Sequence, residues 1–199
     1  MKRYAALLLA GLAFASQASA TVLFADAFQT NLAQWGPNNS GVIVAAPGGG
    51  NALAFTATVG GGDIFTANSI SGGNGGNYTL KFDYLGTCAQ GLQCGGFIGL
   101  NNANGETWLA GSGPYPTLSP IIETGAWQTI TVNFNSASPF KIKIEDWNGA
   151  NDGPTPGNAY FRNLTVSGAV PEPSSWMLMI VGFGLVGVSM RGRKAAVGA

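Results

Sequence analysis

The chain has 199 residues, 9% of them charged, with nine basic and nine acidic residues and no histidine. Without histidine, Ser-His-Asp triads, Cys-His pairs and zinc sites built on imidazole are excluded. Five of the basic residues but only one acidic residue lie in the two terminal segments, so the body between them carries four basic and eight acidic residues, a net charge of −4. An acidic body argues against a nucleic-acid-binding protein.

The N-terminal segment has the order of a secretory signal peptide. Two basic residues precede the apolar run Ala5–Ala15, and a small-residue site follows the run. This order predicts cleavage before Thr21, with Ala18 and Ala20 at the recognition positions. The apolar run is too short to span a membrane stably. We therefore expect residues 1–20 to be a signal peptide that is removed during export.

The body, residues 21–169, consists of short apolar segments separated by glycine, asparagine and proline, and is long enough for one domain. Apolar and polar residues alternate along Tyr78–Leu85, Trp127–Asn135 and Phe140–Trp147, which places one face of each segment in a core and the other in water. Such alternation predicts an all-β fold, an antiparallel two-sheet jelly-roll-like sandwich almost without helix. The other expected strands are Val22–Phe24, Val42–Ala46, Ala52–Val59, Ile64–Ile70, Phe97–Leu100, Thr107–Leu109 and Tyr160–Ser167.

Three segments of the body carry a resemblance to known sandwiches. They are Phe24–Phe28 leading to Trp35, then Trp127–Val132, and the closing segment Tyr160–Val166. In these segments the chain is similar to the jelly rolls shared by carbohydrate-binding modules and laminin-G-like domains. The resemblance implies the fold more than any activity.

The C-terminal segment contains three signals in a fixed order. The tripeptide Pro171-Glu172-Pro173 is followed by the uncharged run Trp176–Met190 and by the basic cluster Arg191–Lys194. The two prolines keep the tripeptide extended and accessible. The run predicts a single transmembrane helix of about 22 Å, shorter than the ~30 Å hydrocarbon core. The basic cluster is expected to stay in the cytoplasm, which leaves the body outside.

The residues Pro171, Glu172, Pro173 and Trp176, with the run Gly182–Gly187 and the basic end, resemble the PEP-CTERM sorting signal in its PEP-x-x-W form, also catalogued as the ice-binding protein C-terminal domain. The resemblance implies processing by an exosortase, a transient inner-membrane anchor, and delivery to the cell surface or exopolysaccharide matrix of a Gram-negative bacterium. A plain tail anchor is the alternative. The expected regions are the sorting signal, residues 170–194, and a cytoplasmic tail, residues 195–199.

The two cysteines, Cys88 and Cys94, are separated by five residues. In an exported protein this spacing predicts a local disulfide that closes a small loop. The spacing is not C-x-x-C, and the chain has no histidine to complete a zinc site. A redox or metal role for the pair is therefore not expected.

The acidic residues do not indicate an enzyme. Glycoside hydrolysis needs two carboxyl groups that face one cleft, whereas the neighbours Glu145 and Asp146 are predicted to point to opposite faces of a strand. We expect the remaining acids of the body to be solvated surface or turn residues. The protein is thus predicted to be non-catalytic, with a carbohydrate-active enzyme as the alternative.

Aromatic residues indicate binding more directly, because sugar rings stack on the flat faces of exposed Trp and Tyr. Trp147 continues the outward positions of its strand, and Trp108 and Tyr115 accompany the long loop Ala110–Thr124. These three are candidate glycan-binding residues, although all three could instead cap or fill the core. The tryptophans expected in the core are Trp35 and Trp127.

No cofactor is expected, apart from a structural calcium ion. The first and last strands often adjoin in such sandwiches, so Asp26 and Asn163 could supply oxygen ligands. Asp and Asn are equally common in turns, which is the alternative. For the body as a whole, two roles remain open: a glycan-binding module for exopolysaccharide, or a structural or adhesive matrix protein. Ice binding is not favoured, because the regular Thr-rich repeat of a flat ice-facing surface is missing.

Overall fold

The structure is a computed structural model that describes residues 20–36, 40–55, 62–72, 76–87, 95–112, 118–147, 159–169 and 180–183. All its strands lie in one compact unit, Ala20–Val170. Outside that unit the structure describes a single helical turn at residues 180–183. Within the described part of the chain, no helix has both the length and the apolar character needed to cross a membrane.

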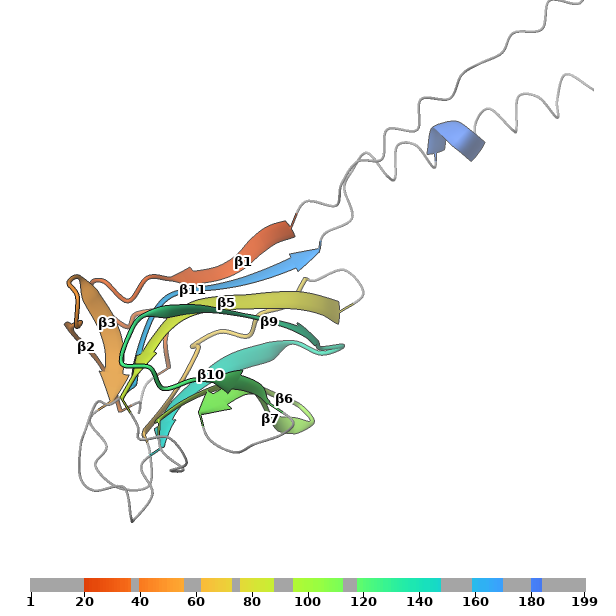
Figure 1. Cartoon of the computed structure of the whole chain (residues 1–199). Helices are drawn as coiled ribbons and strands as arrows, with labels where there is room; N and C mark the ends of the chain where they lie inside the picture. The colour runs from red at the N-terminus through yellow and green to blue at the C-terminus, as the bar shows by residue number, and fades with distance from the viewer. Residues whose placement is uncertain are drawn as a thin grey trace, which may run out of the picture. The chain divides into compact units, whose positions relative to one another are not determined.

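The first sheet has six strands, and its order is β2-β3-β11-β5-β9, with β1 also paired to β11 (Figure 1). All pairings in this sheet are antiparallel. The long strand β11 joins the others, because one end pairs with β3 and the other with β1. The strands are β1 (Ala20–Asp26), β2 (Gly41–Ala45), β3 (Asn51–Phe55), β5 (Asn77–Gly86), β9 (Gln128–Asn135) and β11 (Ala159–Ala169).

The second sheet has five strands in the order β4-β10-β6-β7-β8. Its pairings are antiparallel except between β7 and β8, which run parallel. The short strand β8 was not expected, because it lies within the segment predicted to be a loop and contains Pro120. The strands are β4 (Gly62–Phe65), β6 (Gly95–Asn102), β7 (Gly105–Ser112), β8 (Ser119–Ile121) and β10 (Phe140–Trp147).

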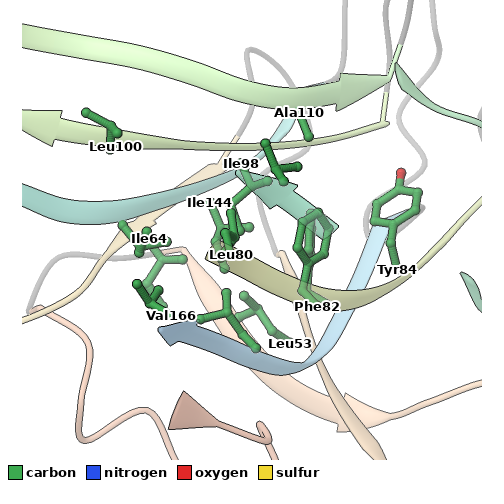
Figure 2. Packing of buried hydrophobic residues seen from close by; sticks show 14 of the residues in the cluster. Leu53, Ile64, Leu80, Phe82, Tyr84, Ile98, Leu100, Ala110, Ile144 and Val166 are labelled. Atoms are coloured by element: carbon green, nitrogen blue, oxygen red, sulfur yellow. The ribbon is translucent and has the colours of Figure 1, made fainter. Parts of the chain in front are cut away.

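The predicted sandwich is confirmed by the core between the two sheets. Figure 2 shows Leu80 and Phe82 of β5 facing Ile98 of β6 and Ile144 of β10 across the layer. These side chains are fully buried, and each contributes roughly 1.5–3 kcal/mol of burial free energy. The predicted alternation along β5 is confirmed as well, since every second residue from Tyr78 onward faces this core. The inner faces of both sheets are therefore filled, and a binding site must use an outer face, a sheet end or a loop.

Candidate functional site: an aromatic pocket on the five-stranded sheet

The structure brings two of the predicted glycan-binding residues together. Trp147 at the end of β10 and Trp108 in β7 lie on the outer face of the five-stranded sheet, on either side of β6. Both line an open cavity of about 240 Å³, which we call the aromatic pocket. Trp147 is 37% exposed and Trp108 is half-buried. The other residues that line the pocket are Phe97, Leu118 and Glu145.

Two glycines allow the aromatic rings to lie against the sheet. A Cβ atom at Gly99 would stand 2.5 Å from the Thr107 carbonyl oxygen and 2.9 Å from the Trp108 ring. A Cβ atom at Gly111 would collide with the ring of Phe97. Because both glycines lack a side chain, the Phe97 and Trp108 rings can approach edge to face, with their centroids 5.8 Å apart. The floor of the pocket thus depends on two positions that accept no side chain.

Beside the pocket, Lys143 is surrounded by three carboxylates. Its ammonium nitrogen lies 3.0 Å from Glu106, 3.1 Å from Glu145 and 3.2 Å from Asp63. The same nitrogen lies 4.7 Å from the centroid of the Trp108 ring. Burial alone would lower the pKa of Lys143, but the hydrogen bonds and charges of the carboxylates outweigh burial and raise that pKa. The lysine is therefore a fixed, charged part of the pocket's edge.

This cluster corrects two expectations from the sequence. Lys143 was expected to be solvated, but it is only 7% exposed because the carboxylates and the Trp108 ring cover it. Asp63 and Glu106 were expected to be scattered surface acids. They converge through strand pairing. Lys143 lies opposite Phe65 of β4 on one side and Gly99 of β6 on the other, and Asp63 and Glu106 are each two residues from the positions in this row, on the same outer face. Only the pairing of β4, β10, β6 and β7 reveals this, and no local sequence signal contains it.

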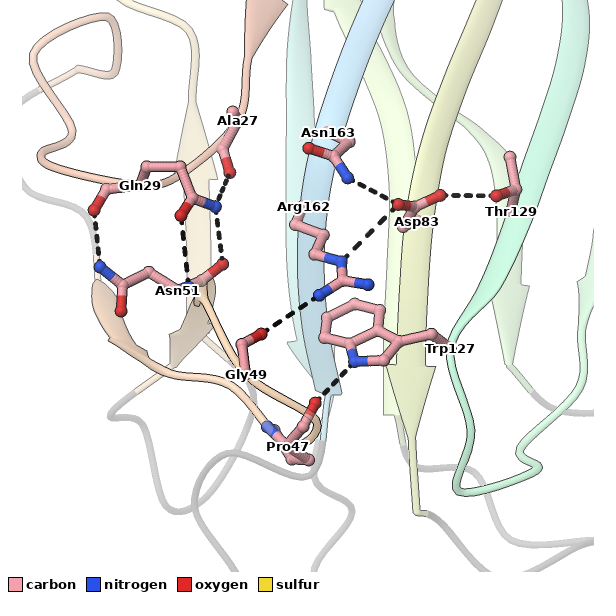
Figure 3. A network of polar contacts seen from close by, with 10 residues as sticks. All are labelled: Ala27, Gln29, Pro47, Gly49, Asn51, Asp83, Trp127, Thr129, Arg162 and Asn163. Carbon is pink, nitrogen blue, oxygen red and sulfur yellow. Dashed lines mark hydrogen bonds and ion pairs between the residues drawn. The ribbon is translucent and has the colours of Figure 1, made fainter.

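The outer face of the other sheet holds another half-buried tryptophan of the described residues, Trp127. Trp127 was expected in the core, and that prediction is wrong. Its ring covers the guanidinium of Arg162, 3.8 Å away, and its indole N–H donates to the Pro47 carbonyl oxygen at 2.7 Å. Figure 3 shows how Asp83 continues this network through Arg162, Thr129 and Asn163. Trp127 is thus held by contacts within the protein. Trp35 is buried as predicted.

The predicted calcium ligands take part in separate networks. One Asp26 oxygen accepts from the backbone N–H of Phe28, and the other accepts from the indole N–H of Trp35. The Asn163 amide donates to Asp83 at 2.7 Å. Among the described residues, no group of three or more acidic, cysteine or histidine side chains is arranged to hold a metal ion. A calcium site at Asp26 and Asn163 stays a prediction.

A buried polar cluster closes one end of the sandwich. The Tyr84 hydroxyl donates to Glu123 at 2.5 Å and accepts from the Gly96 backbone N–H at 2.9 Å. Burial and the neighbouring Glu123 carboxylate raise the pKa of Tyr84 far above its ordinary value. Nearby, Asp146 is 2% exposed, and its Oδ1 atom has no hydrogen-bond partner in the part of the chain that the structure describes. As predicted, Asp146 faces inward while its neighbour Glu145 faces outward.

Several predicted residues fall outside the described part of the chain. The disulfide, the third glycan-binding aromatic residue and the PEP tripeptide therefore stay predictions. Cleavage before Thr21 also stays a prediction, although Ala20 and Thr21 themselves are described and begin strand β1. The predicted residues outside the described part are Ala18, Cys88, Cys94, Tyr115, Pro171, Glu172, Pro173 and Trp176.

Comparison with known families identifies the C-terminal segment. Residues 169–194 match the PEP-CTERM protein-sorting motif. The chain carries a PEP-CTERM sorting signal. This motif implies export and transient membrane anchoring before cleavage, with an exosortase as the processing enzyme. The ice-binding label of the tail is not confirmed, and a search of curated proteins found no match to the chain.

Comparison with solved structures finds domains with a similar fold. The chain is similar to the CBM22-1 xylan-binding domain from Paenibacillus barcinonensis Xyn10C, with 10% identity and a TM-score of 0.50, over 79% of this chain and 100% of that one. It is also similar to the tandem CBM22-1-CBM22-2 domains of the same protein, with 12% identity and a TM-score of 0.52, over 76% of this chain and 50% of that one. A third similar structure is that of the CBM22-1-GH10 modules of Clostridium thermocellum xylanase 10B with xylohexaose, with 12% identity and a TM-score of 0.50, over 73% of this chain and 28% of that one. These likenesses confirm the jelly-roll-like fold.

Proposed function

We propose that the body is a non-catalytic glycan-binding module, which its PEP-CTERM signal delivers to the surface or the exopolysaccharide matrix of a Gram-negative bacterium. The observation that supports this proposal best is the pairing of Trp108 and Trp147 in one solvent-facing pocket. A large tryptophan exposed beside a second one favours a ligand with flat apolar faces, and the two faces of a pyranose ring meet that requirement.

The polar groups of the pocket suit a sugar as well. Carboxylates accept hydrogen bonds, and sugar hydroxyl groups donate them. Glu145 lines the pocket together with both tryptophans and lies two residues before Trp147 on β10, so its carboxylate is available to a sugar hydroxyl there. The fold likeness to xylan-binding domains agrees with such a ligand without deciding its identity.

The way in which the carboxylates are held supports binding without hydrolysis. Hydrolysis requires one carboxyl group that donates a proton and a second that acts on the same bond. Glu106 and Glu145 face the same side of the sheet, but both contact the ammonium of Lys143. Asp146, which burial keeps readily protonated, points into the core instead. A purely structural role in the matrix is the competing proposal.

The two tryptophans Trp147 and Trp127 give a matched test of this function. In affinity electrophoresis through gels that contain xylan, β-glucan or the organism's own exopolysaccharide, Trp147→Ala should weaken retention at least tenfold, because an aromatic platform that the ligand covers contributes about 2 kcal/mol or more. Trp127→Ala removes an aromatic ring of the same size from the opposite sheet and should leave retention unchanged. No retention of the wild-type body on any gel would favour the structural role, and equal retention of both variants would contradict the assignment of binding to this pocket.

Sorting is tested separately from binding. Replacing Pro171-Glu172-Pro173 by three alanines should leave the unprocessed precursor in the inner membrane, because the extended tripeptide is the part that an exosortase recognises. Mass spectrometry of the protein from membrane and matrix fractions would show this as an intact C-terminus in the membrane. A variant that still reaches the matrix with a shortened C-terminus would contradict the sorting proposal and leave the binding proposal untouched.

A further inference from the structure

We propose that the aromatic pocket prefers glycans that carry ammonium groups, that is, polymers of amino sugars, and rejects glycans of uronic acids. This inference rests on the proposed glycan-binding function and names the class of glycan. It follows from which charges of the outer face are buried and which are presented to a ligand.

The cation of the cluster is hidden, while two of its three anions are exposed and the third, Glu145, is 14% exposed. The side chain of Lys143 is 9% exposed, whereas those of Asp63 and Glu106 are 47% and 41% exposed. An ammonium group has three N–H donors, and here three carboxylates lie within 3.2 Å of it. No donor of Lys143 is left for the carboxylate of a uronic acid. What a ligand meets at this edge is a set of acceptor oxygens.

The balance of charge points the same way. Three carboxylates around one ammonium give the cluster a formal charge of −2. The other lysine of this outer face is Lys141, which lies opposite Asn101 of β6. It is six residues from Trp147 along β10, whereas Lys143 is four residues from it. With Lys141 included, the face still carries −1. Uronate groups would be repelled, and ammonium groups attracted, without any rearrangement of the sheet.

The protein itself displays the interaction that such a ligand would make. The Lys143 ammonium is held by carboxylates and by the face of Trp108, with a second ring, that of Phe65, at 5.5 Å. A primary ammonium on a sugar ring could use the same two kinds of partner, an exposed carboxylate and an aromatic face. Trp147 offers the aromatic face in the pocket, and Glu106, which pairs with Lys143 beside Trp108, offers the exposed carboxylate at the pocket's edge.

Three oligosaccharides separate the charge effect from stacking. Binding of the exported protein would be measured by isothermal titration calorimetry at pH 6, with tetramers of glucosamine, N-acetylglucosamine and galacturonic acid. We expect the glucosamine tetramer to bind at least about tenfold more tightly than its N-acetylated counterpart. This advantage should shrink at high salt, and the galacturonic acid tetramer should not bind. Trp147→Ala should weaken binding of both glucosamine-based tetramers.

A charge-matched pair of variants assigns the preference to this face. Glu106→Gln removes one negative charge beside the pocket and leaves Lys143 paired with Asp63 and Glu145, so the fold should persist. Asn135→Lys changes the net charge equally on the exposed face of β9 in the other sheet. We expect the first to reduce the preference for the glucosamine tetramer severalfold and the second to leave it intact.

The outcomes distinguish the two proposals. Equal binding of both glucosamine-based tetramers, tighter binding of the galacturonic acid tetramer, or a full preference in Glu106→Gln would overturn the inference and leave glycan binding in place. A wild-type protein that binds none of the tetramers and is not retained by any polysaccharide gel would overturn glycan binding itself.

Discussion

Replacing Asp146 with asparagine is expected to stabilise the sandwich at pH 8 by up to about 4 kcal/mol and to have little effect near pH 4. Burial, together with the charges of Glu123 and Glu145, raises the pKa of Asp146 to about 7, from 3.8 in the unfolded chain, although the Ala159 backbone N–H acts in the opposite direction. Asparagine resembles the protonated acid in shape and cannot ionise. It therefore removes the cost of a buried charge.

The direction of the pH dependence follows from the number of protons that the folded and unfolded states bind. Between about pH 4 and pH 7 the folded protein holds a proton on Asp146 that the unfolded chain has released, so the free energy of unfolding falls as the pH rises through this window. Urea unfolding of wild type and Asp146→Asn across the window measures the difference. Parallel pH profiles for the two proteins would contradict the expectation.

Asp83 provides a control for which the Asp→Asn substitution should change the stability in the opposite direction. Burial raises its pKa, but hydrogen bonds from Thr129 and Asn163 and the charge of Arg162 outweigh burial and lower it. Asp83→Asn should therefore destabilise the protein above the pKa of the unfolded carboxyl group, and this loss should disappear in acid. If both variants shifted stability in the same direction at pH 8, the contrast between the two environments would be wrong.

Gly99→Ala is expected to destabilise the body by about 1–3 kcal/mol and to weaken glycan binding at the same time. The added Cβ would stand 2.5 Å from the Thr107 carbonyl oxygen and 3.0 Å from the Trp108 Cα atom, so strand β7 itself would have to move. A shift of β7 displaces the Trp108 ring from the pocket floor. Urea unfolding and calorimetric titration would measure the two effects on the same preparation.

Gly36→Ala is the matched control for this change. Among the described residues, a Cβ atom at Gly36 would meet only the Phe65 carbonyl oxygen, at 3.5 Å, which is an ordinary contact. Gly36→Ala should lower the free energy of unfolding much less than Gly99→Ala does, and it should leave glycan binding unchanged. If Gly99→Ala bound glycan as tightly as the control, the pocket floor would have no part in recognition.

Much of the fold could be predicted from the sequence because each strand carries its own signal. The alternation along β5, β9 and β10 depends only on the period of a strand, and it correctly assigned inner and outer faces, including the outward position of Trp147. Strand β8 has no such signal. It is three residues long and pairs in parallel with β7, so only the tertiary structure defines it.

The candidate site was predictable in part. Trp147 was identified from its outward position on a strand and Trp108 from its place beside the long loop, but their proximity depends on β6 lying between β7 and β10. Lys143 and its acids come from three strands far apart in the sequence, and no local pattern links them. Trp127 was misassigned because its stacking partner, Arg162, lies in β11 and became its neighbour only through folding.

The location of the bound sugar tests the central claim most directly. Isotope-labelled body, titrated with the oligosaccharide that it binds most tightly, can be followed through the indole N–H signals of its tryptophans. The aromatic-pocket assignment predicts saturable shifts for Trp108 and Trp147 and none for Trp127 on the opposite sheet or the buried Trp35. Saturable shifts confined to Trp127 and its sheet would contradict that assignment.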